Sequence, residues 1–376
     1  MLHRIGYIYA ERSERGAADM ELLSVTMNDG VMQRSEIEGK DNSSEDKSSY
    51  KVVRKGDIVY NSMRMWQGAN GVSPYDGIVS PAYTVLTAKL PICNDYFAAL
   101  FKNYKLINEF RKNSQGMTSD TWNLKYPQIE TIKVYLPVIE EQEKIASILV
   151  TLDKRIAAQA ALVEQLKKYK RGVVRSLLSP ENCGLKEVQW QCDTIGNLGS
   201  FIKGAPLSKA DISETGTPFI LYGELYTTYH EVITSVVRKT EAVVEQVYHS
   251  MVGDVLIPTS GETSEEISTA SCVMLPGVIL AGDLNIFRST KIDGRIMSYI
   301  LNHIVNGNIA RIAQGKSVVH VQASEISKIE ISYPDPETQI RIIKVLEAIS
   351  NRIESCEKEL NHLTKMRNSL LQQLFI

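Results

Sequence analysis

A long stretch that occurs twice constrains this chain more than any other feature. The first copy runs from Glu140 to Leu178 and the second from Glu337 to Phe375, and they align without a gap at an offset of 197 residues. In each copy apolar residues recur at alternating intervals of four and three, which is typical of a coiled-coil seam. Neither copy contains a proline, so each predicts one uninterrupted helix of roughly 60 Å. The predicted seam residues are Ile145, Leu149, Leu152, Ile156, Gln159, Val163 and Leu166 in the first copy, and Ile342, Leu346, Ile349, Ile353, Cys356, Leu360 and Leu363 in the second.

Polar residues interrupt both seams at matching positions. Gln159 matches Cys356, and Lys170 matches Arg367. Polar residues in a seam usually fix register or oligomeric state at a cost in stability. The alternative is that all four simply occupy a wider part of the interface, and the pattern does not separate the two interpretations. Because the chain supplies one seam per copy, we expect the two helices to pair with each other.

Composition excludes several classes of protein. A chain of 376 residues has room for two or three domains, and no run of eighteen apolar residues or signal-peptide core is present. The five cysteines and six histidines are scattered without metal-ligand spacing, which favours a cytoplasmic protein with reduced thiols and no metal. The net charge of −2 argues against a nucleic-acid binder that relies on electrostatics alone.

Each long helix is preceded by a globular head with mixed helix and strand patterns. Gly56-Asp57 in the first head recurs as Gly253-Asp254 at the same offset of 197 residues. Amphipathic stretches predict a helix over 94–112 and another over 295–313. The fold class is therefore α+β and pseudo-twofold, with expected boundaries at 1–138, 139–180, 181–333 and 334–376. The predicted strands of the first head are Leu22–Met27, Val31–Arg34, Lys51–Val53, Asp57–Tyr60, Tyr83–Thr87 and Ile132–Leu136.

No catalytic motif is visible in the sequence. The segment Ala310–Ser317 imitates a phosphate-binding loop, but a helical pattern precedes it and a strand pattern follows. A phosphate-binding loop needs the reverse order, so that a helix N-terminus faces the phosphates. Glycine-rich nucleotide fingerprints, zinc-ligand sets and Ser-His-Asp arrangements are also missing. This favours a non-catalytic binding protein without a cofactor over an enzyme.

The strongest binding signal follows the strand predicted at Asp57. Arg64, Trp66 and Gln67 lie there in quick succession; Arg and Gln can make bidentate contacts with base edges, and Trp can stack on a base. The alternative is that Trp66 is a core residue and Arg64 a solvated one. Further candidates for DNA contacts occupy similar places in the two halves, although singly each is more often a solvated side chain: Arg111, Lys112 and Gln115, then Thr259, Ser260, Arg311, Gln314, Lys316, Ser317 and Gln322.

The tandem order of head, long helix, head, long helix resembles the specificity subunit of type I restriction-modification systems over nearly the whole chain. Local phrases that carry the resemblance are Lys55–Ile58, Met63–Gly68, Leu136–Ile145 and Gly253–Gly261. The resemblance implies two target recognition domains, each reading one half of a bipartite site in double-stranded DNA. It further implies an antiparallel coiled coil that sets the spacer and docks two methyltransferase subunits. A motor-nuclease subunit would complete the complex, and the specificity subunit itself would do no chemistry.

The first head departs from this pattern at its start. The second head opens with Trp190 and Ile195–Ser200, an opening that the family often shows, and an offset of 197 would place its counterpart before Met1. We therefore expect the first head to lack that strand or to supply it from elsewhere, as a short form or a late start would.

The alternative function is a two-headed coiled-coil adaptor that joins proteins without DNA. Adaptor heads would expose apolar patches, whereas DNA readers would present Arg, Lys, Asn and Gln on one rim. The weak net charge is compatible with DNA reading if partner subunits supply phosphate contacts, because those contacts carry much of the affinity. We therefore expect the isolated chain to bind DNA weakly and to gain affinity on assembly.

Overall fold

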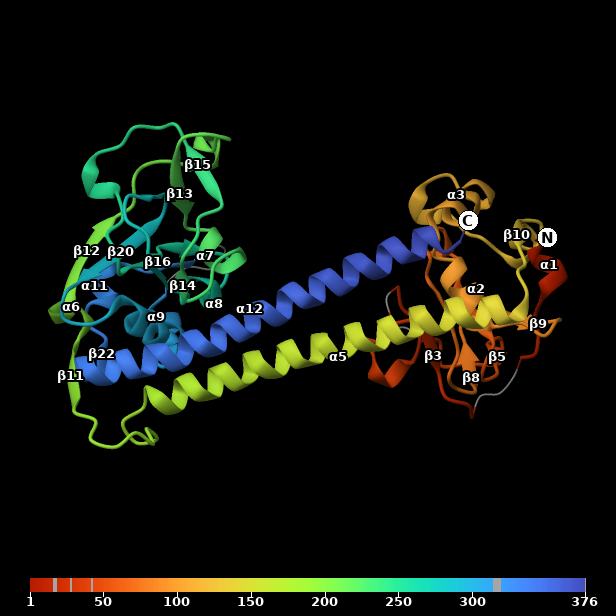
Figure 1. The fold of residues 1–376 in the computed structure, drawn as a ribbon, viewed down its shortest axis with the longest axis horizontal. Helices are drawn as coiled ribbons and strands as arrows, with labels where there is room; N and C mark the ends of the chain where they lie inside the picture. The colour runs from red at the N-terminus through yellow and green to blue at the C-terminus, as the bar shows by residue number, and fades with distance from the viewer. Residues whose placement is uncertain (16–18, 28, 42, 314–318, 376) are drawn as a thin grey trace. The chain divides into compact units, whose positions relative to one another are not determined.

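The computed structural model describes residues 1–15, 19–27, 29–41, 43–313 and 319–375 (Figure 1). Two compact units make up the chain: unit 1 contains Met1–Ala161 and Glu357–Ile376, and unit 2 contains Leu162–Cys356. Each unit thus holds one head and a part of each long helix. The expected α+β architecture of tandem heads with two long helices is confirmed.

Unit 1 has short strands and short helices besides its share of the long ones: β1 (Leu2–Arg4), α1 (Ile5–Ile8), β2 (Tyr9–Glu11), β3 (Leu23–Val25), β4 (Val31–Gln33), β5 (Lys51–Val53), β6 (Ile58–Asn61), β7 (Asn70–Val72), β8 (Gly77–Val79), β9 (Tyr83–Ala88), α2 (Asn94–Leu100), α3 (Tyr104–Asn113), α4 (Tyr126–Ile129) and β10 (Lys133–Tyr135). Its largest sheet is antiparallel, in the order β2-β9-β6-β7. Ile58 and Tyr60 of β6 belong to the core that α2 and α3 share, whereas Val59 points into a second core. The consecutive apolar residues of β6 are thus buried on both faces of the sheet, as the alternation of side chains along a strand requires.

Unit 2 repeats this plan with larger sheets, built from β11 (Trp190–Thr194), α6 (Ile195–Leu198), β12 (Gly199–Lys203), β13 (Thr217–Leu221), α7 (Glu224–Thr227), β14 (Val232–Ile233), β15 (Arg238–Thr240), β16 (Asp254–Pro258), β17 (Ser260–Gly261), α8 (Ser264–Ile267), β18 (Ser271–Val273), β19 (Ile279–Ala281), β20 (Leu284–Ser289), α9 (Gly294–His303), α10 (Asn306–Ile312), β21 (Val319–His320), α11 (Ala323–Ile326) and β22 (Glu330–Pro334). The main sheet has the order β12-β20-β16-β18-β14, and a second sheet has the order β15-β13-β19. Val255 and Ile257 of β16 pack in the core with α9, and Leu256 lies in the opposite core. Strand β16 therefore plays the part in unit 2 that β6 plays in unit 1.

The single helices predicted over 94–112 and 295–313 are wrong, because each is two helices. In unit 1 the break falls before Asn103, whose side chain accepts the Lys105 N–H (3.0 Å) at the start of α3. The same side chain donates to the Leu371 carbonyl (3.2 Å). In unit 2 the break lies between His303 and Asn306. Apolar periodicity runs through both breaks, so the sequence pattern does not reveal them.

The opening strand of the second head has a counterpart in the first. Strand β1 pairs with β10 as β11 pairs with β22, both antiparallel. Ile5 then donates its N–H to the Ile132 carbonyl (2.8 Å), as Ile195 does to Ile329 (3.0 Å). Of the two alternatives expected for the first head, absence of the strand is wrong, and supply of the strand from another place is confirmed. The strand lies at an offset of 190 residues instead of 197, so a search at one fixed offset misses it.

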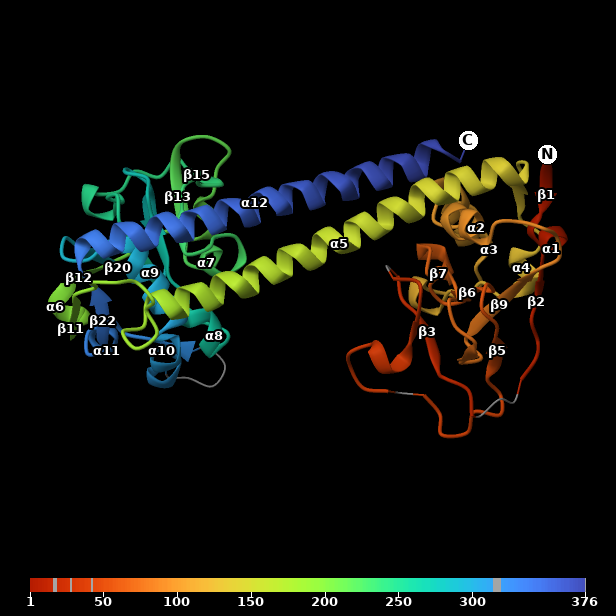
Figure 2. The same ribbon diagram turned by 60° about the horizontal axis from the view of Figure 1, so that its bottom comes forward.

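The long helices are α5 (Ile139–Leu177) and α12 (Pro336–Gln373). In unit 1, Ile145 and Leu149 of α5 lie in one core with Leu371 and Phe375. In unit 2, the end of α5 packs with the beginning of α12, so the helices run antiparallel within each unit (Figure 2). Among the predicted seam residues, Ile145, Leu149, Val163, Ile342, Leu346, Ile353, Cys356 and Leu363 are buried, and Leu152, Ile156, Gln159, Leu166, Ile349 and Leu360 are half-buried.

The two cations of the seam make different ion pairs. Lys170 reaches out of the helix pair to Glu231 of the second head (2.8 Å). Its counterpart Arg367 pairs with Asp153 on the other long helix (2.9 Å). Each cation therefore has a partner inside its own unit.

Candidate nucleic-acid interface

In unit 1 the candidate site is the loop that leaves β6. It forms a short 3-10 turn, Met65–Gln67, which buried Met65 anchors and Gly68 ends with a φ of 88°. This left-handed conformation favours glycine, which has no Cβ. The turn leaves Arg64 and Gln67 exposed. A rigid turn thus presents two side chains capable of bidentate hydrogen bonding.

Trp66 is half-buried and lies at the centre of an aromatic and cationic cluster. Its ring contacts Trp122 edge to face, with centroids 5.2 Å apart, and the Arg111 guanidinium lies 5.7 Å from the Trp66 ring centroid. The indole N–H donates to the Met63 carbonyl (3.0 Å). The structure therefore brings together Trp66 and Arg111, which lie 45 residues apart in sequence.

Trp122 is the member of this cluster that sequence reasoning missed. It lies in a segment that returns antiparallel to Gln115, with Gln115 and Asn123 exchanging both backbone hydrogen bonds (2.9 and 2.8 Å). Exposed Gln115 is thus held close to the aromatic pair. Lys112 is exposed and pairs with Glu109 on its own helix (2.6 Å). The only feature of the sequence that could have pointed to Trp122 was its residue type, since the chain has just three tryptophans.

Unit 2 builds its loop in the same way. The Val321 N–H donates to the Thr259 carbonyl (3.0 Å), just as the Leu124 N–H donates to the Ser62 carbonyl (2.8 Å) in unit 1. Helix α10 packs against α8 as α3 packs against the turn that carries Trp66. The same frame therefore carries both loops.

The side chains on the second frame are chemically different. Thr259 is half-buried, and Ser260 is buried and donates to Asp283 (2.9 Å). Exposed Glu262 and Glu265 lie where unit 1 has its Arg, Trp and Gln residues. Among the remaining candidates, Arg311 at the end of α10 and Gln322 before α11 are exposed, whereas Gln314, Lys316 and Ser317 lie outside the described residues.

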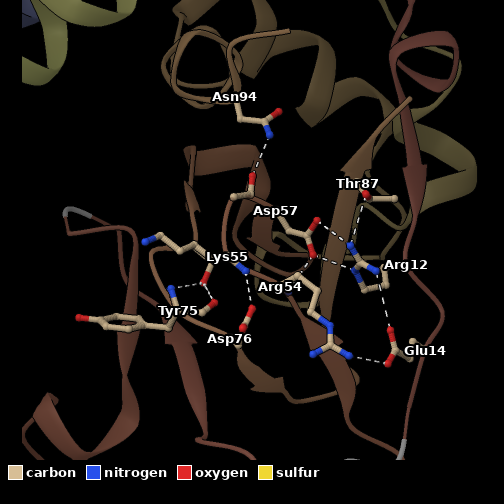
Figure 3. A network of polar contacts seen from close by, with 11 residues as sticks. Arg12, Glu14, Arg54, Lys55, Asp57, Tyr75, Asp76, Thr87 and Asn94 are labelled. Carbon is tan, nitrogen blue, oxygen red and sulfur yellow. Dashed lines mark hydrogen bonds and ion pairs between the residues drawn. The ribbon is translucent and has the colours of Figure 1, made fainter. Parts of the chain in front are cut away.

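An ion pair between a buried aspartate and a half-buried arginine holds the strand that leads into each loop. In unit 1 Arg12 makes a bidentate contact with buried Asp57 (2.8 and 3.0 Å), which also accepts the Arg54 N–H (2.9 Å; Figure 3). Asn94 at the start of α2 donates to the adjacent Gly56 carbonyl (2.7 Å). The hydrogen bond to Asp57 raises the pKa of Arg12, which therefore remains a cation. The turn before β6 is thus held from three sides.

In unit 2 the partner of the buried aspartate comes from another strand. Asp254 is the counterpart of Asp57, and its bidentate partner is Arg288 (2.8 and 2.7 Å). Arg288 belongs to β20, whereas Arg12 follows β2. In unit 1, Thr87 occupies the position of Arg288. In unit 2, Ile202 occupies the position of Arg12. The arginine therefore comes from different strands in the two heads, whereas the buried aspartate has the same position in both.

Neither a metal centre nor a membrane span emerges from the part of the chain that the structure describes. No three His, Cys, Asp or Glu side chains there converge to hold a metal ion. No helix among these residues is long and apolar enough to cross a bilayer.

Comparison of the sequence with known protein families shows which family the chain matches. The model of the type I restriction modification DNA specificity domain matches residues 17–168 and again 187–365. Two relatives from Methanocaldococcus jannaschii are similar: a putative type I restriction enzyme MjaX specificity subunit (23% identical over 353 residues, 88% of this chain and 80% of the relative) and a type I restriction enzyme MjaVIII specificity subunit (22% over 352 residues, 86% and 79%).

Solved structures share the fold. The S subunit of a type I restriction-modification system from M. genitalium has a TM-score of 0.62 at 17% identity, covering 100% of this chain and 96% of its own. A chain from a study of complex assembly and conformational transition of the type I restriction-modification system has a TM-score of 0.61 at 14% identity, covering 100% and 97%.

Proposed function

The chain belongs to the type I restriction-modification DNA specificity family, and from that premise we propose that it is the DNA-reading subunit of such a system. It is non-catalytic; adenine methylation and DNA cleavage belong to partner subunits. The adaptor function without DNA is not favoured, because the family match covers both heads. The heads at 1–138 and 181–333 are the target recognition domains, and the helices at 139–180 and 334–376 are the connecting pair.

One observation carries this proposal: the two heads present different side chains on the same frame. A subunit that reads two unlike half-sites needs this arrangement, since the frame positions a loop while its side chains choose the base. In unit 1, Arg64 and Gln67 offer bidentate contacts to guanine and adenine respectively. In unit 2 the exposed carboxylates of Glu262 and Glu265 accept hydrogen bonds, as the amino group of cytosine requires.

The aromatic and cationic cluster of unit 1 adds a second mode of contact. Arg111 lies over the Trp66 ring, and its guanidinium remains exposed to solvent. A guanidinium held in this way loses less conformational entropy when it binds a phosphate or a base edge. We assign Arg111 and Lys112 to DNA contacts in this head, and Arg311 and Gln322 to the corresponding contacts in the other.

The partners follow from the same proposal. They are double-stranded DNA, two methyltransferase subunits that dock around the helix pair, and a motor-nuclease subunit in the full complex. The helix pair sets the spacer between the two half-sites. Because the net charge of the chain is −2, the methyltransferase subunits supply much of the contact with phosphates.

The test is methylome sequencing of cells that carry this chain with the methyltransferase subunit encoded beside it. The proposal predicts methyladenine in one motif of two short halves around a fixed gap. Cells that carry the methyltransferase alone are the control and show no such motif. A chain that co-purifies with no methyltransferase and directs no methylation contradicts the proposal.

A further inference from the structure

Strands β1 and β10 of unit 1 (Figure 1) place two cations side by side. Arg4 lies directly opposite Lys133 in the antiparallel register, and both are exposed. Like charges at directly opposite positions destabilise a pair of strands. Among the residues that the structure describes, neither side chain has a hydrogen bond or an ion pair that offsets this repulsion. A bound anion would offset it.

The equivalent strands of the second head carry different residues. Thr194 of β11 lies opposite Glu330 of β22. They take the places of the two cations at offsets of 190 and 197 residues. Because β11 and β22 pair without the cations, the frame that both heads share does not need them. The repulsion is thus particular to the first head, where the two cations have a use other than strand pairing.

Both cations line a surface hollow of about 510 Å³. This volume falls within the range of sites that bind small molecules. Glu130, the acid of this lining, forms no ion pair with either cation, so both charges remain available to a ligand. The other lining residues are Leu2, His3, Gly6, Tyr7 and Thr131.

An aromatic ring adds a second kind of surface to the hollow. The rings of His3 and Tyr7 stack, with centroids 4.8 Å apart and planes 17° apart. The imidazole covers one face of the Tyr7 ring, yet Tyr7 remains 54% exposed, so its other face is open. Any nucleobase can stack on such a face, because every base has a π-face. The second head has Asn197 at this place.

We propose that this hollow binds an unpaired nucleotide. Arg4 and Lys133 hold its phosphate, whose charge of about −2 matches two cations, and Tyr7 stacks on its base. Thr131 and Glu130 provide hydrogen-bonding groups for the sugar hydroxyls. The nucleotide is unpaired, because a base within a duplex is already stacked between its neighbours. Its source is either a free nucleotide or the end of a DNA strand.

This site goes beyond the reading of duplex DNA. The hollow is lined by none of the residues of the Arg64–Gln67 loop, to which we assign base reading. Binding of a nucleotide there needs neither the methyltransferase subunit nor a target motif, so the inference does not depend on the proposed function.

The test is isothermal titration calorimetry of the full chain with AMP, inorganic phosphate and a 5′-phosphorylated thymidine pentanucleotide. The variants Arg4→Thr, Lys133→Glu and Tyr7→Asn each introduce the residue type that the second head has at the same place, so unit 1 is expected to tolerate them. Lys125→Glu is the matched control, since Lys125 is exposed in the same unit, lies outside the lining and undergoes the same change of charge. Thermal unfolding checks that each variant folds.

AMP binds the wild-type chain and the control alike, and Arg4→Thr and Lys133→Glu each weaken its binding by about tenfold or more. Tyr7→Asn weakens AMP binding by a similar factor and leaves the weaker binding of inorganic phosphate unchanged. Without ligand, Lys133→Glu raises the unfolding temperature, because an attractive cross-strand pair replaces a repulsive one. If the cations served only to hold the strands together, this variant would lower it.

The tighter ligand among AMP and the pentanucleotide identifies the source of the nucleotide. Inorganic phosphate that binds as tightly as AMP, with Tyr7→Asn changing neither, overturns the assignment of a nucleotide. A wild-type chain that binds none of the three probes overturns the site. If Lys133→Glu changes only the methylation of duplex DNA, the cations contact the duplex backbone, and the inference is overturned while the proposed function stands. A chain that binds AMP but directs no methylation contradicts the proposed function alone.

Discussion

Gln142 and Gln339 make the same two hydrogen bonds in the two units. Each donates from Nε2 to the proline carbonyl five residues earlier (2.9 and 2.8 Å). Each accepts with Oε1 the N–H of a residue that directly precedes a helix, Cys93 before α2 in unit 1 and Asp293 before α9 in unit 2 (3.0 and 2.9 Å). Both side chains are buried, at 2% and 3% exposure. One glutamine thus joins the start of each long helix to the head that precedes it.

Replacing Gln142 by Leu is expected to lower the free energy of unfolding of unit 1 by about 2–4 kcal/mol, because two buried backbone groups lose their partners. Urea unfolding in a Trp190→Phe background measures this, since only Trp66 and Trp122 then report. Gln165→Leu is the matched control on an exposed position of α5 and changes little. Equal midpoints for the two variants would show that the junction is not needed.

The contact between Lys170 and Glu231 predicts that replacing Lys170, a seam residue of α5, lowers the stability of unit 2. Glu231 also contacts His303 (2.8 Å), and Lys170 lies 5.3 Å from the Tyr299 ring centroid. Lys170→Met leaves the half-buried carboxylate without its cation and is expected to cost about 3 kcal/mol in unfolding free energy. Lys168→Met, at an exposed neighbour, is the control. The double variant Lys170→Met with Glu231→Gln recovers most of the loss, and no recovery would mean that packing, not charge, explains the effect.

The same carboxylate makes stability depend on pH. Burial alone would raise the pKa of Glu231, but the hydrogen bond with His303 and the charge of Lys170 lower it well below its usual range. A lowered folded-state pKa contributes stability above the unfolded pKa of about 4.3, and this contribution is lost as the pH falls towards the folded pKa. The difference in unfolding free energy between the wild-type chain and Glu231→Gln should therefore shrink from pH 5 to pH 3. A difference that does not change over this interval would contradict the assignment.

The arginine that pairs with the buried aspartate lies on different strands in the two heads, and this difference predicts a rescue. Arg12→Ile leaves buried Asp57 uncompensated and is expected to destabilise unit 1 by about 3 kcal/mol. Adding Thr87→Arg should restore much of this, because the new guanidinium lies where Arg288 contacts Asp254 in unit 2. Thermal unfolding compares the single and double variants. A double variant less stable than Arg12→Ile would show that the two heads are not interchangeable at this pair.

Arg111→Ala is expected to weaken methylation at the wild-type motif through one half-site only. Loss of a cation at the DNA surface costs about 1–3 kcal/mol if it contacts a base edge. Lys105→Ala, at another exposed position of α3, is the control. The fraction of motif sites methylated in cells measures the effect, and sequence variants at each half show which half has relaxed. Relaxation in both halves would contradict the assignment of Arg111 to one head.

The long helices and the duplicated plan could be predicted because both are repeated patterns in the sequence. The seam from Ile145 onward has a fixed period, and Asp57 and Asp254 recur at a fixed offset. The break between α2 and α3 could not be predicted in this way, because Asn103 begins a new helix while the apolar spacing continues through it. Strand β1, which precedes Ile5, was missed because the chain between β1 and β6 is shorter than the corresponding chain between β11 and β16 in the second head.

The candidate site was predicted only in part. Arg64 and Trp66 stood out because they follow a buried strand, but their neighbour Trp122 comes from a segment that only the fold brings near. The partner of each buried carboxylate was also hidden, because Arg12 and Arg288 occupy different strands. Long-range side-chain contacts of this kind leave no local period in a sequence.

Exchange of one head tests the central claim most directly. Residues 1–138 would be replaced by the first head of another family member whose motif is known, with α5, unit 2 and the methyltransferase left unchanged, followed by methylome sequencing. The account predicts a motif in which one half is replaced, while the other half and the gap length stay as in the wild-type chain. A chimera that folds and binds the methyltransferase, yet changes both halves or neither, would contradict it.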